Sequence, residues 1–330
     1  METIGPNART SEARVKVQHM AESVGRKDGA TVTAAGAHTS WLAALSQRVA
    51  SALVLIPIVI ALVFFGGWIA YAGAVVALIL GAYELHDMLR HGGWRPLSLI
   101  GVGVSIMFLT AARVLALSHD RSLVFFLLGG GISLLLVVPA GWLILTRRSF
   151  QGAVLDWALT LVGAIYLGWP LACFIILRGD HAGVSTSGFW WLLATFFMVW
   201  TDDTFALLTG HYFGRHKLAP HISPGKTWEG FYGGLAFTVV AALVFVIALP
   251  NAFGHPLNVA WYHAVILGVL VAIASTIGDL AESLLKRATG VKDSGKLVPG
   301  HGGILDRMDS LLFAVLVVLF YAAFLNAVAI

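Results

Sequence analysis

The stretch from residue 260 to residue 281, AWYHAVILGVLVAIASTIGDLA, decides the fold class of this chain. Asp279 is its only Asp, Glu, Lys or Arg, and the run exceeds the ~18 apolar residues that mark a membrane-spanning helix. A backbone in lipid has no water to bond, so such a run must be helical. The whole chain has the same character, because 58% of its 330 residues are hydrophobic and only 12% are charged, about half the usual share. The sequence therefore predicts an all-α, polytopic integral membrane helical bundle.

We expect about nine transmembrane helices, separated by glycines, prolines and polar residues. They are predicted near residues 49–66, 68–86, 97–117, 123–145, 155–177, 187–209, 229–249, 260–281 and 310–329. Residues 1–45 are rich in Ala, Gly, Ser and Thr and predict a disordered cytoplasmic tail. Residues 46–185 then hold the first five spans. Residues 186–330 hold the last four spans with their cytoplasmic loops and form the predicted catalytic region.

The basic residues indicate which side of the membrane each loop occupies. With the N-terminal tail in the cytoplasm, 18 of the 21 Lys and Arg residues fall in that tail or in loops on the same side. The opposite side holds Arg113, Arg121 and Arg178. Cytoplasmic loops carry an excess of Lys and Arg. The sequence therefore predicts a protein of the cell inner (plasma) membrane, with its N-terminus and its polar loops in the cytoplasm.

Two adjacent acids, Asp202 and Asp203, lie in the last part of the apolar run 187–209. Charged residues at membrane depth are costly and usually line a polar cavity or a site. No basic residue lies close to them in the sequence, which favours a metal ion or a distant basic partner. A salt bridge to a neighbouring helix is the structural alternative.

The loop after these acids contains SPGKTWEG, residues 223–230. Ser223, Lys226 and Thr227 offer hydroxyls and a cation beside free backbone amides, a combination that can hold phosphate. The end of a P-loop is similar, but Pro220 stands where that motif needs its first glycine, and we expect no strand before it. We therefore predict a phosphate-binding loop of another kind, with a solvated turn as the alternative.

The run 260–281 leads directly into a basic segment. On a helix, Asp279, Ser283 and Lys286 are spaced so that they share one face. Asp279 lies below the membrane surface there, which favours a metal ligand that faces into the bundle. Glu282 and Lys286 are four residues apart and could simply pair with each other.

Charge and backbone freedom are concentrated in SLLKRATGVKDSGKLVPGHGGILDRMDS, residues 283–310. His301, Gly302 and Gly303 precede a predicted helix, and glycines at a helix start leave backbone N–H groups free for anions. Asp306 and Asp309 are three residues apart, so both can face one site. The cations of this segment are Lys286, Arg287, Lys292, Lys296 and Arg307. Acidic lipid headgroups would explain the cations alone.

The interleaved aspartates indicate more than a lipid-binding patch. Carboxylates beside cations make chemical sense where a divalent metal bridges the carboxylates to phosphate groups. The sequence thus predicts phosphoryl or nucleotidyl transfer at the cytoplasmic membrane surface, a reaction that depends on positioning and charge stabilisation. The single cysteine, Cys173, excludes both an intrachain disulfide and a Cys-based metal site.

The same segment resembles the signature of the phosphatidate cytidylyltransferase (CDP-diacylglycerol synthase) family, in the run Ser283-x-Leu285-Lys286-Arg287, Lys292-Asp293-x-Gly295 and Pro299-x-His301-Gly302-Gly303-Ile304-x-Asp306-Arg307-Met308-Asp309. The upstream segments GRHKLAPHISPGKTWEG and GDLAESLLKR are similar to further motifs of that family, in the same order. In this register Asp203, and not Asp202, matches the family's aspartate. The resemblance is specific over roughly residues 200–310.

The resemblance implies transfer of the cytidylyl group of CTP to phosphatidic acid, giving CDP-diacylglycerol and pyrophosphate, in phospholipid biosynthesis. It implies Mg²⁺ with a monovalent cation such as K⁺, and CTP, phosphatidic acid, the lipid bilayer and a second copy of the chain in a homodimer as partners, without nucleic acid. The catalytic residues carried over are Asp279, Lys226, Lys286 and Asp309. The metal ligands are Asp203, Asp279, Asp306 and Asp309. The substrate-binding residues are Ser223, Thr227, Ser283, Arg287, Lys292, His301, Gly302, Gly303 and Arg307.

Two alternative functions stay open at this point. A CTP-dependent enzyme that acts on another lipid phosphate, such as a polyprenyl phosphate, would share most of this site. A membrane transporter of anionic solutes would also combine intramembrane acids with basic loops. Against a transporter, the polar residues are concentrated on one side of the membrane, whereas a pathway through the protein needs them at both faces.

Overall fold

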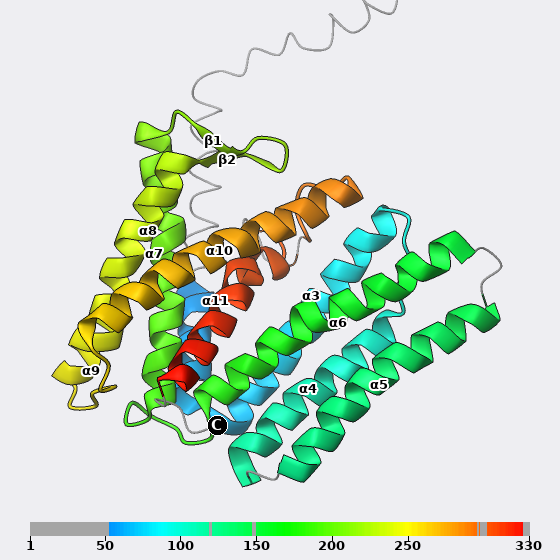
Figure 1. Cartoon of the computed structure of the whole chain (residues 1–330), viewed down its shortest axis with the longest axis horizontal. Helices are drawn as coiled ribbons and strands as arrows, with labels where there is room; N and C mark the ends of the chain where they lie inside the picture. Colours follow the sequence, from blue (N-terminus) through cyan, green and yellow to red (C-terminus); the bar gives the residue numbers. More distant parts are fainter. Residues whose placement is uncertain (1–52, 119–120, 147–149, 296, 298–301, 326–330) are drawn as a thin grey trace, which may run out of the picture. The chain divides into compact units, whose positions relative to one another are not determined.

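The computed structural model describes residues 53–118, 121–146, 150–295, 297 and 302–325 (Figure 1). The predicted tail and the first residues of the predicted span 49–66 lie outside the described residues, as do Lys296 and His301. In chain order the elements are an apolar helix Leu53–Phe65, α3 Gly67–His91, α4 Ser98–Ser118, α5 Arg121–Thr146, α6 Phe150–Arg178, α7 Ser187–Phe213, β1 Lys217–Ala219, β2 Ser223–Thr227, α8 Trp228–Ala242, the π-helix η1 Leu243–Ala248, α9 Leu249–Ala252, α10 Trp261–Thr289 and α11 Leu305–Phe324.

Most of the predicted spans are found as helices. Within the described residues, eight helices are long and apolar enough to cross a membrane, with α8, η1 and α9 forming one run from Trp228 to Ala252. The described part of the first predicted span is the shorter apolar helix Leu53–Phe65. The prediction of a helical membrane bundle with about nine spans is therefore confirmed. The predicted division into regions 46–185 and 186–330 stays a prediction.

The break between the first two helices is formed by two glycines, as predicted. Gly66 and Gly67 have φ angles of 61° and 51°, in the left-handed region that residues with a side chain rarely adopt. The buried side chain of Arg178 donates to the backbone carbonyls of Val63 and Phe64, which the ending helix leaves without partners. A Cβ on Gly66 would lie 2.7 Å from this guanidinium. The turn and the buried arginine therefore depend on each other.

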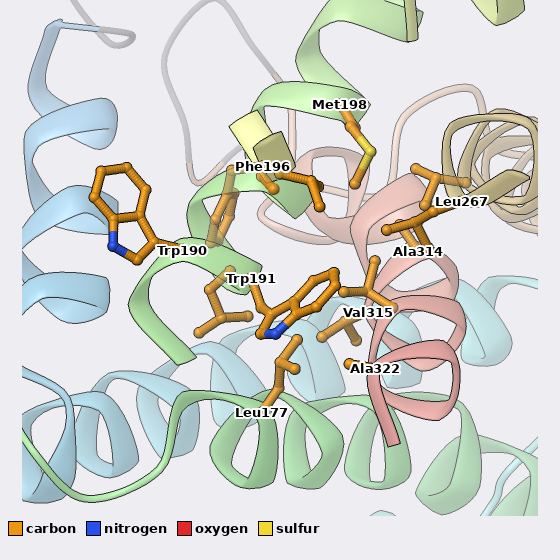
Figure 2. Close-up of a cluster of buried hydrophobic side chains, with 14 of the residues drawn as sticks. Leu177, Trp190, Trp191, Phe196, Met198, Leu267, Ala314, Val315 and Ala322 are labelled. Carbon is orange, nitrogen blue, oxygen red and sulfur yellow. The ribbon is translucent and has the colours of Figure 1, made fainter. Parts of the chain in front are cut away.

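Two clusters of buried apolar side chains hold the helices together. One cluster, drawn in Figure 2, joins α6, α7, α8, α10 and α11 and includes Trp191, Leu267 and Val315. The other joins α3, α4 and α6 to the first turns of α11 and includes Leu78 and Leu305. Lipid is as apolar as these side chains, so the clusters stabilise the bundle by close packing and not by the hydrophobic effect. Because α11 belongs to both clusters, its position is fixed from two sides.

The loop after α7 forms a short antiparallel hairpin. Lys217 lies opposite Thr227, and Ala219 lies opposite Ser223. The expectation that no strand precedes the SPGKTWEG segment was wrong, because strands of three and five residues are too short to show an alternating pattern. The Thr227 hydroxyl accepts a hydrogen bond from the backbone N–H of Gly230 at 3.1 Å and so caps α8. The hairpin is therefore attached to the start of that helix.

Candidate functional site

The predicted site residues gather at one end of the helices. The hairpin lies near the C-terminal half of α10, and the C-terminal end of α3 lies near the start of α11 (Figure 1). Arg287 of α10 donates from Nε to the backbone carbonyl of Ile222 in the hairpin turn, at 3.2 Å. Arg113, which the charge pattern assigned to the opposite side of the membrane, forms an ion pair with Asp180 at 2.5 Å near the Gly66–Gly67 turn. Arg113 and Arg178, both assigned to that side, thus lie close to the same turn.

The hairpin contributes one cation to the polar face of α10. The Nζ of Lys226 lies 2.5 Å from Oδ2 of Asp279, and the two side chains are 25% and 29% exposed. Ser283, one turn further along α10, donates from its hydroxyl to Oδ1 of Asp279 at 3.3 Å. Of the three residues predicted to share a face of α10, Asp279 and Ser283 are thus in contact. Lys286 instead contacts Glu282, the pairing that their spacing also allowed. The tertiary structure also brings the cation of Lys226, which is distant in the sequence, to Asp279.

Four carboxylates from three helices form what we call the acid cluster: Asp203 of α7, Asp279 and Glu282 of α10, and Asp309 of α11. Asp203 is exposed and lies within electrostatic range of Asp279, Asp309 and Lys226. Asp309 interacts in the same way with Asp279 and with Glu282, and its Oδ1 accepts from the adjacent Ser310 N–H at 2.6 Å. Negative charge is therefore concentrated where α7, α10 and α11 meet.

Asp202 points elsewhere. Its side chain is buried and accepts a hydrogen bond from the Thr238 hydroxyl of α8 at 3.4 Å. Neighbouring residues on a helix point in different directions, yet Asp202 also lies within electrostatic range of Lys226 and Asp279. Of the two adjacent acids, the resemblance selects Asp203. Asp202 instead links α7 to α8.

The acid cluster suits a hard cation in its chemistry. Carboxylate oxygens are the ligands that Mg²⁺ prefers. Oε1 of the fully buried Glu282 has no hydrogen-bond partner among the described residues, so one oxygen remains to be satisfied. Among the residues that the structure describes, no three His, Cys, Asp or Glu side chains lie close enough together to hold a metal ion. The donor atoms fit a metal, then, but their present spacing does not chelate one.

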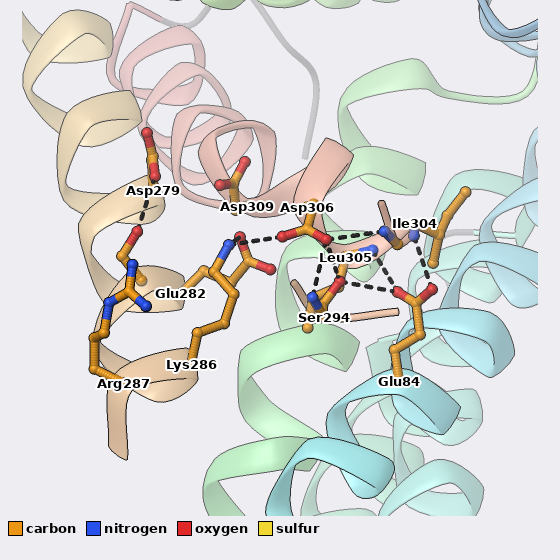
Figure 3. A network of polar contacts seen from close by, with 12 residues as sticks. Glu84, Asp279, Glu282, Lys286, Arg287, Ser294, Ile304, Leu305, Asp306 and Asp309 are labelled. Carbon is orange, nitrogen blue, oxygen red and sulfur yellow. Dashed lines mark hydrogen bonds and ion pairs between the residues drawn. The ribbon is translucent and has the colours of Figure 1, made fainter. Parts of the chain in front are cut away.

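A second network lies beside the acid cluster and is drawn in Figure 3. Asp306 of α11 is its centre. Oδ1 of Asp306 lies 2.6 Å from Nζ of Lys286, which also contacts Oε2 of Glu282 at 3.2 Å. Oδ2 of Asp306 accepts from the Ser294 hydroxyl at 2.7 Å, the Ser294 N–H at 3.0 Å and the Gly303 N–H at 2.9 Å. Both oxygens of Asp306 are thus occupied by groups of the chain itself, and its predicted role as a metal ligand gains no support.

Glu84 of α3 enters this network from the N-terminal half of the chain. Its side chain is 1% exposed. Oε1 accepts from the Ile304 N–H at 3.0 Å, and Oε2 accepts from the Leu305 N–H at 2.8 Å. Oε2 also lies 3.4 Å from the Ser294 hydroxyl, which donates its one hydrogen over the shorter distance to Asp306. A buried carboxylate at a helix start is stabilised by these N–H groups and by the helix dipole.

The start of α11 therefore binds carboxylate groups, and these carboxylates are side chains of the protein itself. The N–H groups of Gly303, Ile304 and Leu305 are occupied by Asp306 and Glu84. The prediction that the glycines leave these N–H groups free for a substrate phosphate was wrong. The sequence could not show that a carboxylate more than two hundred residues away fills the same place.

The other predicted substrate-binding residues occupy several positions around the two networks. Ser223 begins β2, and the hydroxyl of Thr227 is used in the cap of α8. Lys292 and Arg307 are exposed. Gly302 has a φ of 82°, and a Cβ there would lie 2.8 Å from Oδ2 of Asp306. The residue His301 lies outside the described residues.

Three residues of the site were missed in the sequence. Glu84 is an acid near the end of an apolar run, and the membrane-depth argument that selected Asp279 applies equally to it. Ser294 lies inside the quoted polar segment but carries no pattern of its own. Tyr166 of α6 has a buried hydroxyl without a hydrogen-bond partner in the described part of the chain, within electrostatic range of Glu282 and Asp309. No sequence signal marked that tyrosine.

Comparison with known proteins places the chain in one family. Residues 46–325 match the model of a family described as the cytidylyltransferase family. A phosphatidate cytidylyltransferase of Haemophilus influenzae is 35% identical over 290 residues, which cover 82% of this chain and 96% of the relative. Relatives of the same name from Pseudomonas aeruginosa and Synechocystis are 34% and 32% identical, covering 82% and 85% of this chain and 94% and 97% of their own lengths. This integral membrane chain belongs to the cytidylyltransferase family.

Proposed function

We propose that this chain transfers the cytidylyl group of CTP to phosphatidic acid and releases pyrophosphate. The observation that carries the proposal is the ion pair of Lys226 and Asp279, with Asp203 within electrostatic range of both and of Asp309, in a chain whose relatives are named phosphatidate cytidylyltransferase. Carboxylates and a cation at one membrane end suit a reaction between a soluble nucleotide and a lipid phosphate. Neither a transporter nor an enzyme specific for polyprenyl phosphates is favoured by these relatives.

The proposed reaction needs little help from a general base. A phosphate oxygen of phosphatidic acid attacks the α-phosphorus of CTP and forms a new P–O bond, while the bond between the α-phosphorus and the bridging oxygen breaks. Pyrophosphate leaves with that electron pair. The attacking oxygen is already anionic, so the protein mainly has to orient two anions and offset their repulsion.

The cations of the chain are proposed to offset that repulsion. Lys226 is held by Asp279 in a position to contact phosphate oxygens. Ser283, Arg287, Lys292 and Arg307 lie on the adjoining segments and are proposed to bind the remaining phosphate oxygens, together with Ser223 and His301. Thr227 and Lys286 would have to exchange their present partners to do so, and for them a structural role is the simpler proposal.

Mg²⁺, with a monovalent cation such as K⁺, is the proposed cofactor. Asp203, Asp279 and Asp309 would hold it. When bound, it would neutralise phosphate oxygens and make the α-phosphorus more electrophilic. We further propose that the site faces the cytoplasm from the inner membrane, where CTP is available, and that the protein forms a homodimer.

A direct assay tests the proposal. Purified protein in detergent is incubated with α-labelled CTP, Mg²⁺ and phosphatidic acid, and both products are measured. Equal amounts of CDP-diacylglycerol and pyrophosphate are expected. Pyrophosphate release without a labelled lipid product would refute the proposal. Reaction with a polyprenyl phosphate but not with phosphatidic acid would replace the proposed substrate.

A further inference from the structure

Glu84 connects the N-terminal half of the chain to the polar segment 283–310 of the C-terminal half by hydrogen bonds. It lies on α3, and the two backbone N–H groups that it binds lie 220 and 221 residues further along the chain. In Figure 3 its carboxylate faces Ser294, Ile304 and Leu305 from the side opposite to Lys286 and Asp279. It therefore contacts the segment that carries the site without belonging to the acid cluster.

We propose that Glu84 is a positioning residue for cytidylyl transfer: it fixes the start of α11 and thereby sets the place of Asp309 and Arg307 relative to Asp279. The proposal rests on the proposed function for its kinetic part. Its structural part, the ordering of residues 302–309 by a carboxylate of α3, is independent of any substrate.

The contacts run without interruption from Glu84 to the acid cluster. Glu84 binds the N–H groups of the first turn of α11, and Leu305 and Asp309 are four residues apart, one above the other on that helix. In parallel, Ser294 connects Glu84 to Asp306, and Asp306 holds Lys286 at 2.6 Å. A shift at Glu84 would therefore move Asp309 through the helix and Lys286 through the ion pair.

Two glycines of the polar segment provide room for this carboxylate. A Cβ on Gly295 would lie 2.4 Å from Oε1 of Glu84, with the two other nearest atoms also from Glu84. A Cβ on Gly303 would lie 2.4 Å from Oε2 of Glu84 and 2.1 Å from the Ser294 hydroxyl. These glycines are thus needed for the approach of Glu84, which gives a physical reason for their place in the segment.

A glutamine at position 84 would keep the shape of the side chain and change its hydrogen bonding. Its amide oxygen can accept from one backbone N–H, but its NH₂ group would face the other N–H, and two donors cannot bond to each other. The first turn of α11 would lose one anchor while the apolar packing around it stayed the same. A misplacement of catalytic groups by ~1 Å can reduce the rate about 100-fold.

The test compares Glu84→Gln with a matched buried acid at a distance from the site. Asp156 of α6 is also buried, and its Oδ1 accepts the Arg95 N–H at 2.6 Å. Asp156→Asn should therefore have a similar effect on thermal stability. We expect Glu84→Gln to lower kcat by about 10- to 100-fold with a smaller change in KM for CTP. Asp156→Asn should leave both constants of the folded protein unchanged.

Hydrogen exchange supplies a readout that needs no turnover. In Glu84→Gln, the amides of Ile304 and Leu305 should exchange faster, whereas those of α4 and α5 should not. Unchanged protection at these two amides would overturn the proposal, and so would a kcat equal to that of the unaltered protein. If the unaltered protein makes no CDP-diacylglycerol, the proposed function fails, and the exchange measurement still decides the positioning role.

A compensating pair tests the contact itself. Gly295→Ala should reduce kcat because its methyl group meets Glu84. Glu84→Asp shortens the side chain by one methylene and makes room for that methyl group. The double variant should therefore be more active than the product of the two single effects predicts. A strictly multiplicative loss would show that the two residues do not act through this contact.

Discussion

The ammonium group of Lys226 lies 2.5 Å from a carboxylate oxygen of Asp279, so the β-hairpin supplies a cation to the middle of the polar face of α10. Both side chains are partly exposed, and a pair of this kind contributes only about 0–1 kcal/mol to stability. The pair is therefore of little use as a structural link. The proposed function gives this pair another use, which is to present one cation and one carboxylate side by side to the same ligand.

Replacement of this lysine should separate activity from stability. We expect Lys226→Met to lower kcat/KM by about 100-fold or more, because a phosphate-binding cation is lost, and to shift the melting temperature by no more than ~4 °C. Lys217→Met, an exposed lysine on the other strand of the hairpin, is the matched control and should retain activity. Equal kinetics for both variants would show that Lys226 does not contact substrate.

The acid cluster should bind a divalent cation before any substrate is present. Mn²⁺, used in place of Mg²⁺, can be followed by electron paramagnetic resonance of the purified protein. We expect Asp203→Asn and Asp309→Asn each to weaken Mn²⁺ binding by at least about tenfold. Asp156→Asn is the control, because this buried acid accepts the Arg95 N–H and lies away from the cluster. A similar loss in all three variants would contradict the assignment of Asp203.

The ion pair of Lys286 and Asp306 should behave as a structural element. The two side chains are only 13% and 9% exposed, and removing one partner of a buried pair destabilises a protein by about 3–5 kcal/mol. Asp306→Ala should therefore lower the melting temperature by several degrees and leave Mn²⁺ affinity close to that of the unaltered protein. A loss of Mn²⁺ binding without a loss of stability would restore Asp306 as a metal ligand.

The orientation in the membrane can be mapped with single cysteines. Cys173 is the only cysteine of the chain and is buried, so Cys173→Ala gives a clean background. Lys217 in β1 and Ser185 before α7 are both exposed and lie at opposite ends of α7. In intact cells, a membrane-impermeant maleimide should label Ser185→Cys and not Lys217→Cys. The reverse pattern would place the site outside the cytoplasm.

Much of the architecture followed from local properties of the sequence. Long apolar runs can only be helices in lipid, so the spans and the break at Gly66 and Gly67 were predicted without any tertiary contact. The pairing of Asp279 and Ser283 on one face of α10 followed from helix periodicity. The hairpin was missed because strands this short leave no periodic pattern.

Contacts between distant segments were decided by the tertiary structure alone. The sequence offered both Asp306 and Asp309 as metal ligands. In the structure, packing of α11 against α3 and α10 places Asp306 against Lys286 and Ser294 and leaves Asp309 for the acid cluster. Glu84 meets Leu305 across 221 residues of chain. Composition and periodicity describe single helices, whereas such a meeting depends on how whole helices pack. The sequence by itself thus determined which helices form and what chemistry they carry, and the tertiary structure determined which charges face one another.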